Sequence, residues 1–238
     1  MLVGLLMVGG GVIAGAFGSL LGLGGGVLIV PLLTLGFGLP LREAVGVSLI
    51  CVIMTSSAAA GVYLERHIAN LRLGMTLELF TAFGALLGGS IAFLLDERTL
   101  SALFAALLLY VAFTMVRGRG PEPALERPPA DAETEVGESR ASGTVLERLS
   151  GDGYHVRNLG RGVVGATGAG IASALLGIGG GIIKVPLMHL SMGVPLRVAT
   201  ATSNMMIGIT AAASAVIYVI HGGIDPYVAG PTAIGVFV

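Results

Sequence analysis

Residues 20–32 read LLGLGGGVLIVPL, and residues 175–187 read LLGIGGGIIKVPL. These two stretches, called here the first and second glycine segments, lie 155 positions apart. They belong to a longer alignment of residues 15–48 with residues 170–203, which has no gap and in which half of the positions are identical. A glycine-rich apolar segment closed by proline, present twice in one chain, indicates an internal repeat of the kind found in many membrane transporters.

The composition predicts that lipid surrounds much of the chain. Apolar residues make up 54% of the sequence and charged residues only 11%, against about 25% charged in typical soluble domains. A 24.0 kDa chain with a mean hydropathy of +0.92 has more apolar surface than one aqueous core can bury. The net charge of −1 excludes the basic footprint of a nucleic-acid-binding protein. The single cysteine, Cys51, rules out a disulfide framework and is interpreted as a small buried hydrophobe.

Apolar stretches near the roughly 20 residues of a spanning helix occur on both sides of a hydrophilic region. We expect spans near residues 2–17, 44–64, 73–95, 99–116, 160–175 and 198–220, with a further one beginning near Tyr227. The sequence thus predicts an all-α, polytopic membrane protein with two homologous helical repeats, residues 1–116 and residues 159–238, each containing a Gly/Pro-broken helix. By comparison with the first repeat, the second is interpreted as truncated at its C-terminus, and one more span is expected to follow.

The hydrophilic region, residues 117–158, carries about half of the charged side chains of the chain and four prolines. Such a stretch has too little apolar material to offset the entropy of ordering, so we predict a flexible linker. Its arginines lie on the same side as Arg66 and Arg72 in the predicted topology, and the positive-inside rule places that side in the cytoplasm.

The glycine segments are the main candidates for a functional site. Each glycine costs about 1 kcal/mol relative to alanine inside a helix, so clustered glycines followed by Pro31 or Pro186 predict broken helices. Broken helix at membrane depth persists only where protein or a water-filled cavity surrounds it. Because glycine leaves backbone N–H groups accessible and helix N-termini attract anions, we predict an anion site near the midplane. Close helix packing through small residues is the alternative. The substrate-binding glycines expected from this argument are Gly24, Gly25, Gly26, Gly179, Gly180 and Gly181.

Polar side chains near these segments extend the candidate site. Lys184 is the only lysine of the chain, and an ammonium in a membrane helix costs at least about 2.5 kcal/mol, so a role in binding an anion is expected unless the side chain extends to the interface. Ser48, its repeat counterpart Ser203, and Asn204 are further candidates as hydrogen-bond donors to the anion. Helix capping and interhelical bonding are their alternative roles. Glu78 is interpreted either as a coupling carboxylate or as a side chain that reaches the headgroups.

Enzymatic chemistry finds no support in the sequence. The GxGxxG pattern fails because Val27 and Ile182 occupy the last glycine position, and the spanning segments contain neither HExxH nor GxSxG. We therefore predict a protein that is not an enzyme, with no catalytic residues, no cofactor and no metal site.

The doubled GLGGGVLIVPL and GIGGGIIKVPL, their continuations PLREAVGVSL and PLRVATATSN, and the central hydrophilic linker resemble the sulfite exporter TauE/SafE family, also called the TSUP permeases. The resemblance covers roughly residues 1–115 and 160–238. It implies a multi-pass permease of the bacterial or archaeal inner membrane that transports small, often sulfur-containing anions such as sulfite or sulfonates.

Two questions stay open at this point. The repeats are either parallel or inverted, depending on whether residues 19–38 cross the membrane, and we favour inverted repeats because both glycine segments then meet at one depth. The chain is either a secondary transporter, expected to export its anion, or a membrane scaffold or regulatory subunit that transports nothing. The expected partners are a small anion and the lipid bilayer, with no nucleic acid, and a homo-oligomer is left open.

Overall fold

The computed structural model describes residues 2–20, 25–65, 68–116, 150 and 154–237. Every regular element in these ranges is helical, which confirms the all-α prediction. The elements are α1 (Leu2–Leu20), α2 (Gly26–Pro31), η1 (Leu32–Gly36), α3 (Leu41–Glu65), α4 (Leu71–Leu94), α5 (Glu97–Val116), α7 (Leu159–Leu176), α8 (Gly181–Pro186), η2 (Leu187–Ser191), α9 (Leu196–Ile220) and α10 (Pro226–Phe237). Gly24 and most of the predicted linker, residues 117–149 and 151–153, lie outside the described residues.

Four of these helices, α3, α4, α7 and α9, are long and apolar enough to cross a membrane within the described residues. Their outer faces carry large exposed hydrophobic side chains, such as Leu79, Phe83, Val164 and Val219. A water-soluble protein rarely exposes so much apolar surface, whereas lipid tails cover it without cost. The prediction of a multi-pass membrane protein is therefore confirmed.

Both glycine segments contain a broken helix, as predicted. The second segment ends α7 at Leu176 and resumes helix at Gly181, and between them Gly177, Gly179 and Gly180 all have positive φ. Side chains disfavour this left-handed region, which explains why glycine occupies it. In the first segment, Gly25 likewise precedes α2 with a φ of 76°.

The proline that closes each segment is followed by a wide helical turn. Pro31 ends α2 and the π-helical η1 follows it, and Pro186 ends α8 and the π-helical η2 follows it. Proline has no N–H group to donate and its ring crowds the preceding turn, so a local departure from α geometry at this point has a physical cause. From Gly25 and Gly180 onward, the described residues of the two segments share one local structure.

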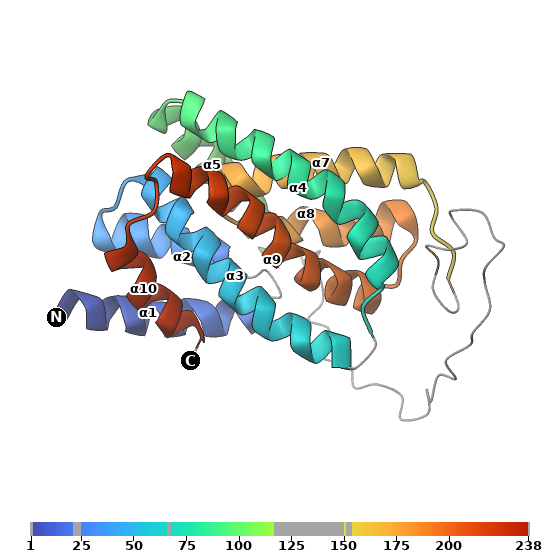
Figure 1. The fold of residues 1–238 in the computed structure, drawn as a ribbon, viewed down its shortest axis with the longest axis horizontal. Helices are drawn as coiled ribbons and strands as arrows, with labels where there is room; N and C mark the ends of the chain where they lie inside the picture. Colours follow the sequence, from blue (N-terminus) through green and yellow to red (C-terminus); the bar gives the residue numbers. More distant parts are fainter. Residues whose placement is uncertain (1, 21–24, 66–67, 117–149, 151–153, 238) are drawn as a thin grey trace.

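The helices of the two chain halves are interleaved. Helix α1 packs against α10, α4 packs against α7, and α3 packs against α9. Figure 1 shows that α3 and α9 run side by side in opposite directions, from the left to the lower right and back. Glycine permits the closest of these contacts: a Cβ atom added to Gly170 of α7 would lie 2.0 Å from the carbonyl oxygen of Thr81 in α4.

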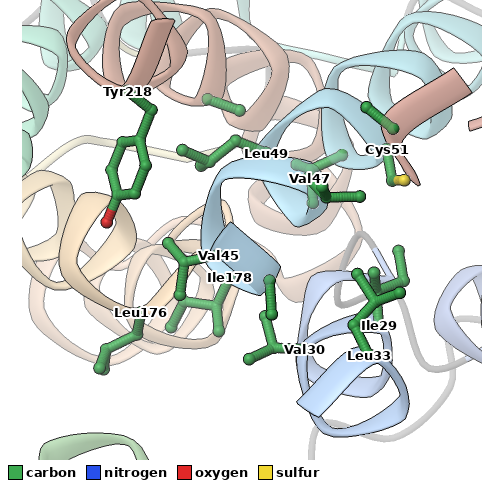
Figure 2. Packing of buried hydrophobic residues seen from close by; sticks show 14 of the residues in the cluster. Ile29, Val30, Leu33, Val45, Val47, Leu49, Cys51, Leu176, Ile178 and Tyr218 are labelled. Atoms are coloured by element: carbon green, nitrogen blue, oxygen red, sulfur yellow. The ribbon is translucent and has the colours of Figure 1, made fainter. Parts of the chain in front are cut away.

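A hydrophobic cluster joins both glycine segments to α3. Figure 2 shows Val45 of α3 beside Ile178 of the second glycine segment, with Ile29 of the first segment and Leu33 of η1 on the neighbouring helical stretch. These side chains are fully buried. Their burial holds the described parts of both segments against α3.

The last residues of the predicted linker are packed against the helices. Tyr154 accepts a hydrogen bond from Nδ2 of Asn70 at 2.7 Å, Val156 is buried, and the backbone N–H of Arg157 donates to the carbonyl of Met192 at 3.0 Å. The packed part of the second half therefore begins before residue 159.

Candidate functional site

The two glycine segments meet at Ser48 of α3. The Ser48 hydroxyl donates to the carbonyl oxygen of Gly177 at 2.8 Å and lies 3.4 Å from that of Gly26. A Cβ atom on Gly26 would lie only 2.3 Å from the Gly177 oxygen, so this approach of two backbones requires glycine. The two glycine segments are therefore in contact at Gly26 and Gly177, called here the backbone junction. The Ser48 hydroxyl proton bonds to the Gly177 carbonyl at this junction.

Lys184 of α8 lies in a buried polar cluster with Glu78 of α4 and Thr210 of α9, called here the ion-pair cluster. The Lys184 Nζ atom is 3.3 Å from Oε2 of Glu78 and donates to Oγ1 of Thr210 at 2.5 Å. The Thr210 hydroxyl lies 2.7 Å from Oε1 of Glu78 and 3.1 Å from the carbonyl oxygen of Met206. The side chains of Lys184 and Glu78 are only 1% and 7% exposed.

This geometry shows where both charged side chains lie. Neither Lys184 nor Glu78 extends to the surface of the described structure, because each is buried against the other. Charges removed from water persist only when they are paired and hydrogen-bonded, and the cluster meets both conditions. In the part of the chain that the structure describes, this is the one side-chain ion pair within 4.0 Å.

Two buried hydroxyl groups beside the second glycine segment have no hydrogen-bond partner among the residues that the structure describes. Ser173 of α7 and Ser203 of α9 are 0% and 1% exposed, and their Oγ atoms are unpaired. A Cβ atom on Gly180 would lie 3.4 Å from both Ser173 Cβ and Lys184 Cε, so these two side chains flank the same point of the backbone. A Cβ atom on Gly181 would lie 3.8 Å from Ser203 Oγ.

Orphaned buried hydroxyls are uncommon, because each loses its hydrogen bonds to water without replacement. Ser173 flanks Gly180 together with Lys184, and Ser203 lies near Gly181, so both hydroxyls are donors available to a small oxyanion at the start of α8. We call Lys184, Ser173, Ser203 and the backbone of Gly180 and Gly181 the anion-site candidates.

The other predicted residues lie around this centre with different surroundings. Asn204 is buried, and its backbone carbonyl accepts a hydrogen bond from Ser56. Gly179 packs against side chains, since a Cβ atom there would lie 2.5 Å from Cγ2 of Ile207. Gly25 is the N-cap residue of α2, near the backbone of Ala14.

Sequence reasoning did not find Ser173 or Thr210. Serine and threonine commonly bond back to their own helix in membrane proteins, so single hydroxyls carry little signal. Glu78 and Lys184 are 106 positions apart and on unrelated parts of the repeat, so their pairing was not visible in the sequence.

Arg42 belongs to a separate group at one end of the bundle. Its Nη2 atom donates to the carbonyl oxygen of Leu95 at 2.7 Å, and its guanidinium lies 5.3 Å from the ring centre of Phe93. Phe93 also stacks on His221 and meets the edge of Tyr218. This arrangement secures the end of α4 and is distinct from the ion-pair cluster.

Among the described residues, no group of three or more His, Cys, Asp or Glu side chains lies close enough together to hold a metal ion.

Comparison with known proteins gives one family. The profile described as "Sulfite exporter TauE/SafE" matches residues 7–238. The chain is 26% identical over 222 residues to "Probable membrane transporter protein YunE" of Bacillus subtilis, covering 90% of this chain and 78% of the relative. A "Probable membrane transporter protein" of Xylella fastidiosa is 29% identical over 205 residues, covering 86% and 69%. A Methanocaldococcus jannaschii relative with the same description is 27% identical over 214 residues, covering 87% and 69%. No solved structure gives a significant match.

Proposed function

The chain belongs to the sulfite exporter TauE/SafE family and is a multi-pass membrane transporter, and we propose that it is a secondary transporter that exports small sulfur-containing or organic anions across the inner membrane. The observation that carries this proposal is a buried ammonium, Lys184, on a broken helix beside two unpaired hydroxyls. The relatives are described as transporters without a substrate, so the proposed anion class rests on the description of the family and on the chemistry of this site.

The anion-site candidates suit a tetrahedral or pyramidal oxyanion. Lys184 supplies a positive charge, and a charge acts more strongly in a buried site than in water. Ser173 and Ser203 supply hydroxyl donors that are unoccupied in the described structure. Sulfite and sulfonates carry several acceptor oxygens around one sulfur atom, so they can accept from an ammonium and two hydroxyls together.

The interleaved arrangement of the helices supports a transport cycle. The anion-site candidates lie on α7, α8 and α9, and Glu78 on α4 completes the ion-pair cluster. Because α3 and α9 run in opposite directions and carry the matching serines Ser48 and Ser203, the arrangement suits inverted repeats that rock around a central site.

A binding experiment tests the anion class directly. Purified protein in detergent is heated with sulfite, sulfate, thiosulfate, taurine or sulfoacetate, and the melting temperature is recorded. An anion that binds the folded state raises the melting temperature as its concentration exceeds the dissociation constant. Failure of every one of these compounds to raise it would remove the support for an anion transporter and favour the scaffold.

A flux experiment tests the role of Lys184. Liposomes that contain the protein and are loaded with an anion that raised the melting temperature are expected to release this anion. The Lys184→Ala substitution is expected to abolish the release. Arg161→Ala is the matched control, because it removes an exposed positive charge near the start of α7 and should leave flux unchanged. Each variant is first checked for a monodisperse elution profile. Flux through Lys184→Ala at the wild-type rate would contradict the proposed site.

A further inference from the structure

We propose that Glu78 takes up one proton when the anion binds, so that anion and proton cross the membrane together in the same direction. This inference rests on the proposed function, since it concerns the same Lys184 that holds the anion. The observation behind it is that the charge of Lys184 is already paired in the described structure, with Glu78 at 3.3 Å.

The first step concerns the charge balance of the buried cluster. With Glu78 ionised, the cluster contains one negative and one positive charge and is neutral. Binding of a monovalent anion to Lys184 would add a second negative charge to a buried site, which is costly without compensation. Protonation of Glu78 removes this excess, and Lys184 then pairs with the anion in place of the carboxylate. The buried site is neutral both before and after binding.

The second step concerns the hydrogen bonds, which Thr210 can satisfy in both states. Its single hydroxyl proton has two acceptors within reach, Oε1 of Glu78 at 2.7 Å and the carbonyl oxygen of Met206 at 3.1 Å. When Glu78 is ionised, the Thr210 proton points to the carboxylate. When Glu78 is protonated, the hydroxyl turns to Met206 and its oxygen accepts from the carboxylic acid. Thr210 is therefore a positioning residue that adapts to either protonation state.

The third step concerns other ionisable groups that could take the same proton. The helices packed against α4 and α8 are α7 and α9, with η2 following α8. The ionisable residues on these elements and at their ends lie away from the cluster or bond elsewhere: Arg72 at the start of α4, Arg161 near the start of α7, Arg197 near the start of α9, His189 on the carbonyl of Val194, Tyr218 on the carbonyl of Ala174, and His221 after α9. Among the described residues, Lys184 alone forms an ion pair with Glu78.

The test measures proton uptake during binding. Isethionate is used as the anion because a sulfonate stays ionised across the pH range, so any proton taken up enters the protein. Wild-type protein in weakly buffered detergent solution is mixed with isethionate, and a pH indicator reports the protons removed from solution. We expect about one proton for each anion bound, and an affinity that falls about tenfold for each pH unit above the range in which empty Glu78 is protonated.

Glu78→Gln separates the inference from its premise. Glutamine mimics the protonated carboxyl, so this variant should bind isethionate without proton uptake and with an affinity that does not change with pH. Glu65→Gln, at the exposed end of α3, should behave as the wild type. Binding to wild-type protein without proton uptake, or retained uptake in Glu78→Gln, would overturn the inference and leave the anion transporter in place. If wild-type protein binds no sulfonate at any pH, the proposed function fails and the inference fails with it.

Discussion

Serine hydroxyls around the glycine segments differ in the bonds they form, although two of them hold matching positions in the repeat. Ser48 donates to the backbone of the second glycine segment, whereas Ser203 and Ser173 have no partner. A hydroxyl that bonds to backbone stabilises the fold, but an unpaired buried hydroxyl opposes it. Substitution by alanine should therefore have opposite consequences at the two kinds of position.

Ser173→Ala is expected to preserve or slightly raise the melting temperature of the empty protein, because it removes an unpaired buried group. It should also weaken anion binding about 10- to 100-fold, the value of one hydrogen bond to a charged partner, about 1.5–3 kcal/mol. Titration of the melting temperature with sulfite or isethionate measures both effects. A lower melting temperature with unchanged affinity would show that Ser173 has a structural role only.

Ser48→Ala is expected to lower the free energy of unfolding by about 1–3 kcal/mol, because it removes the donor to the buried Gly177 carbonyl. Ser48→Thr keeps the hydroxyl and serves as the control. Thermal unfolding in detergent without added anion gives the comparison. Equal stability of wild type and Ser48→Ala would contradict a structural role for this bond.

Gly26→Ala tests the backbone junction. The added Cβ would lie 2.3 Å from the Gly177 oxygen, so the two segments must separate, at a cost of about 1–3 kcal/mol or more. Gly61→Ala is the matched control within α3, because its Cβ meets no atom within 4 Å. We expect a clear fall in melting temperature for Gly26→Ala and little change for Gly61→Ala. Similar melting temperatures of the two variants would contradict a contact between Gly26 and Gly177 that requires glycine.

The candidate site could be predicted from the sequence only where one residue was unusual in its surroundings. Lys184 was visible because it is the only lysine and lies in an apolar stretch. Glu78 was ambiguous, since its distance from the helix end allowed either burial or contact with headgroups. The bond that joins them, and the place of Thr210 between them, depend on how α4, α8 and α9 pack, which no local pattern encodes.

Among the helices, boundaries marked by glycine and proline were the most predictable feature. The clustered glycines predicted the breaks before α2 and α8, because positive φ and low helix propensity act locally. The π-helical turns after Pro31 and Pro186 were not predicted. The sequence pattern indicates that the α-helix is interrupted, but it does not indicate which helical geometry follows the interruption. The packed residues 154–158 were assigned to the linker because their contacts, such as Tyr154 with Asn70, are with distant residues.

The start of α4 depends on Asn70, which is the helix N-cap. Its Oδ1 accepts from the N–H of Leu73 at 3.0 Å, and its Nδ2 donates to Tyr154 at 2.7 Å. Asn70→Ala removes both bonds and is expected to cost about 1–2 kcal/mol. Asn70→Asp keeps the cap acceptor and should retain most of the stability. Melting temperatures of the two variants measure the difference, and equal losses would assign the effect to the contact with Tyr154 and not to the cap.

For the whole molecule, the direction of matching helices is the property that decides how transport could work. The first helix of each half packs against a helix of the other half, α1 against α10 and α7 against α4, and the central pair α3 and α9 run in opposite directions. Two halves related in this way can exchange conformations, so that a site between them opens first to one side and then to the other. The sequence offset aligns the residues of the two halves, whereas the opposite directions of α3 and α9 are seen only in the structure.

Inverted repeats predict that matching residues lie on opposite faces of the membrane. Pro40 and Pro195 are matching, exposed residues just before α3 and α9, and the native Cys51 is buried. In a Cys51→Ser background, Pro40→Cys and Pro195→Cys should react with a membrane-impermeant thiol reagent from opposite sides of sealed vesicles. The Cys51→Ser protein without a new cysteine provides the unlabelled control. Labelling of both positions from the same side would mean that the repeats are parallel. A motion other than the rocking of inverted repeats would then have to open the anion-site candidates first to one side of the membrane and then to the other.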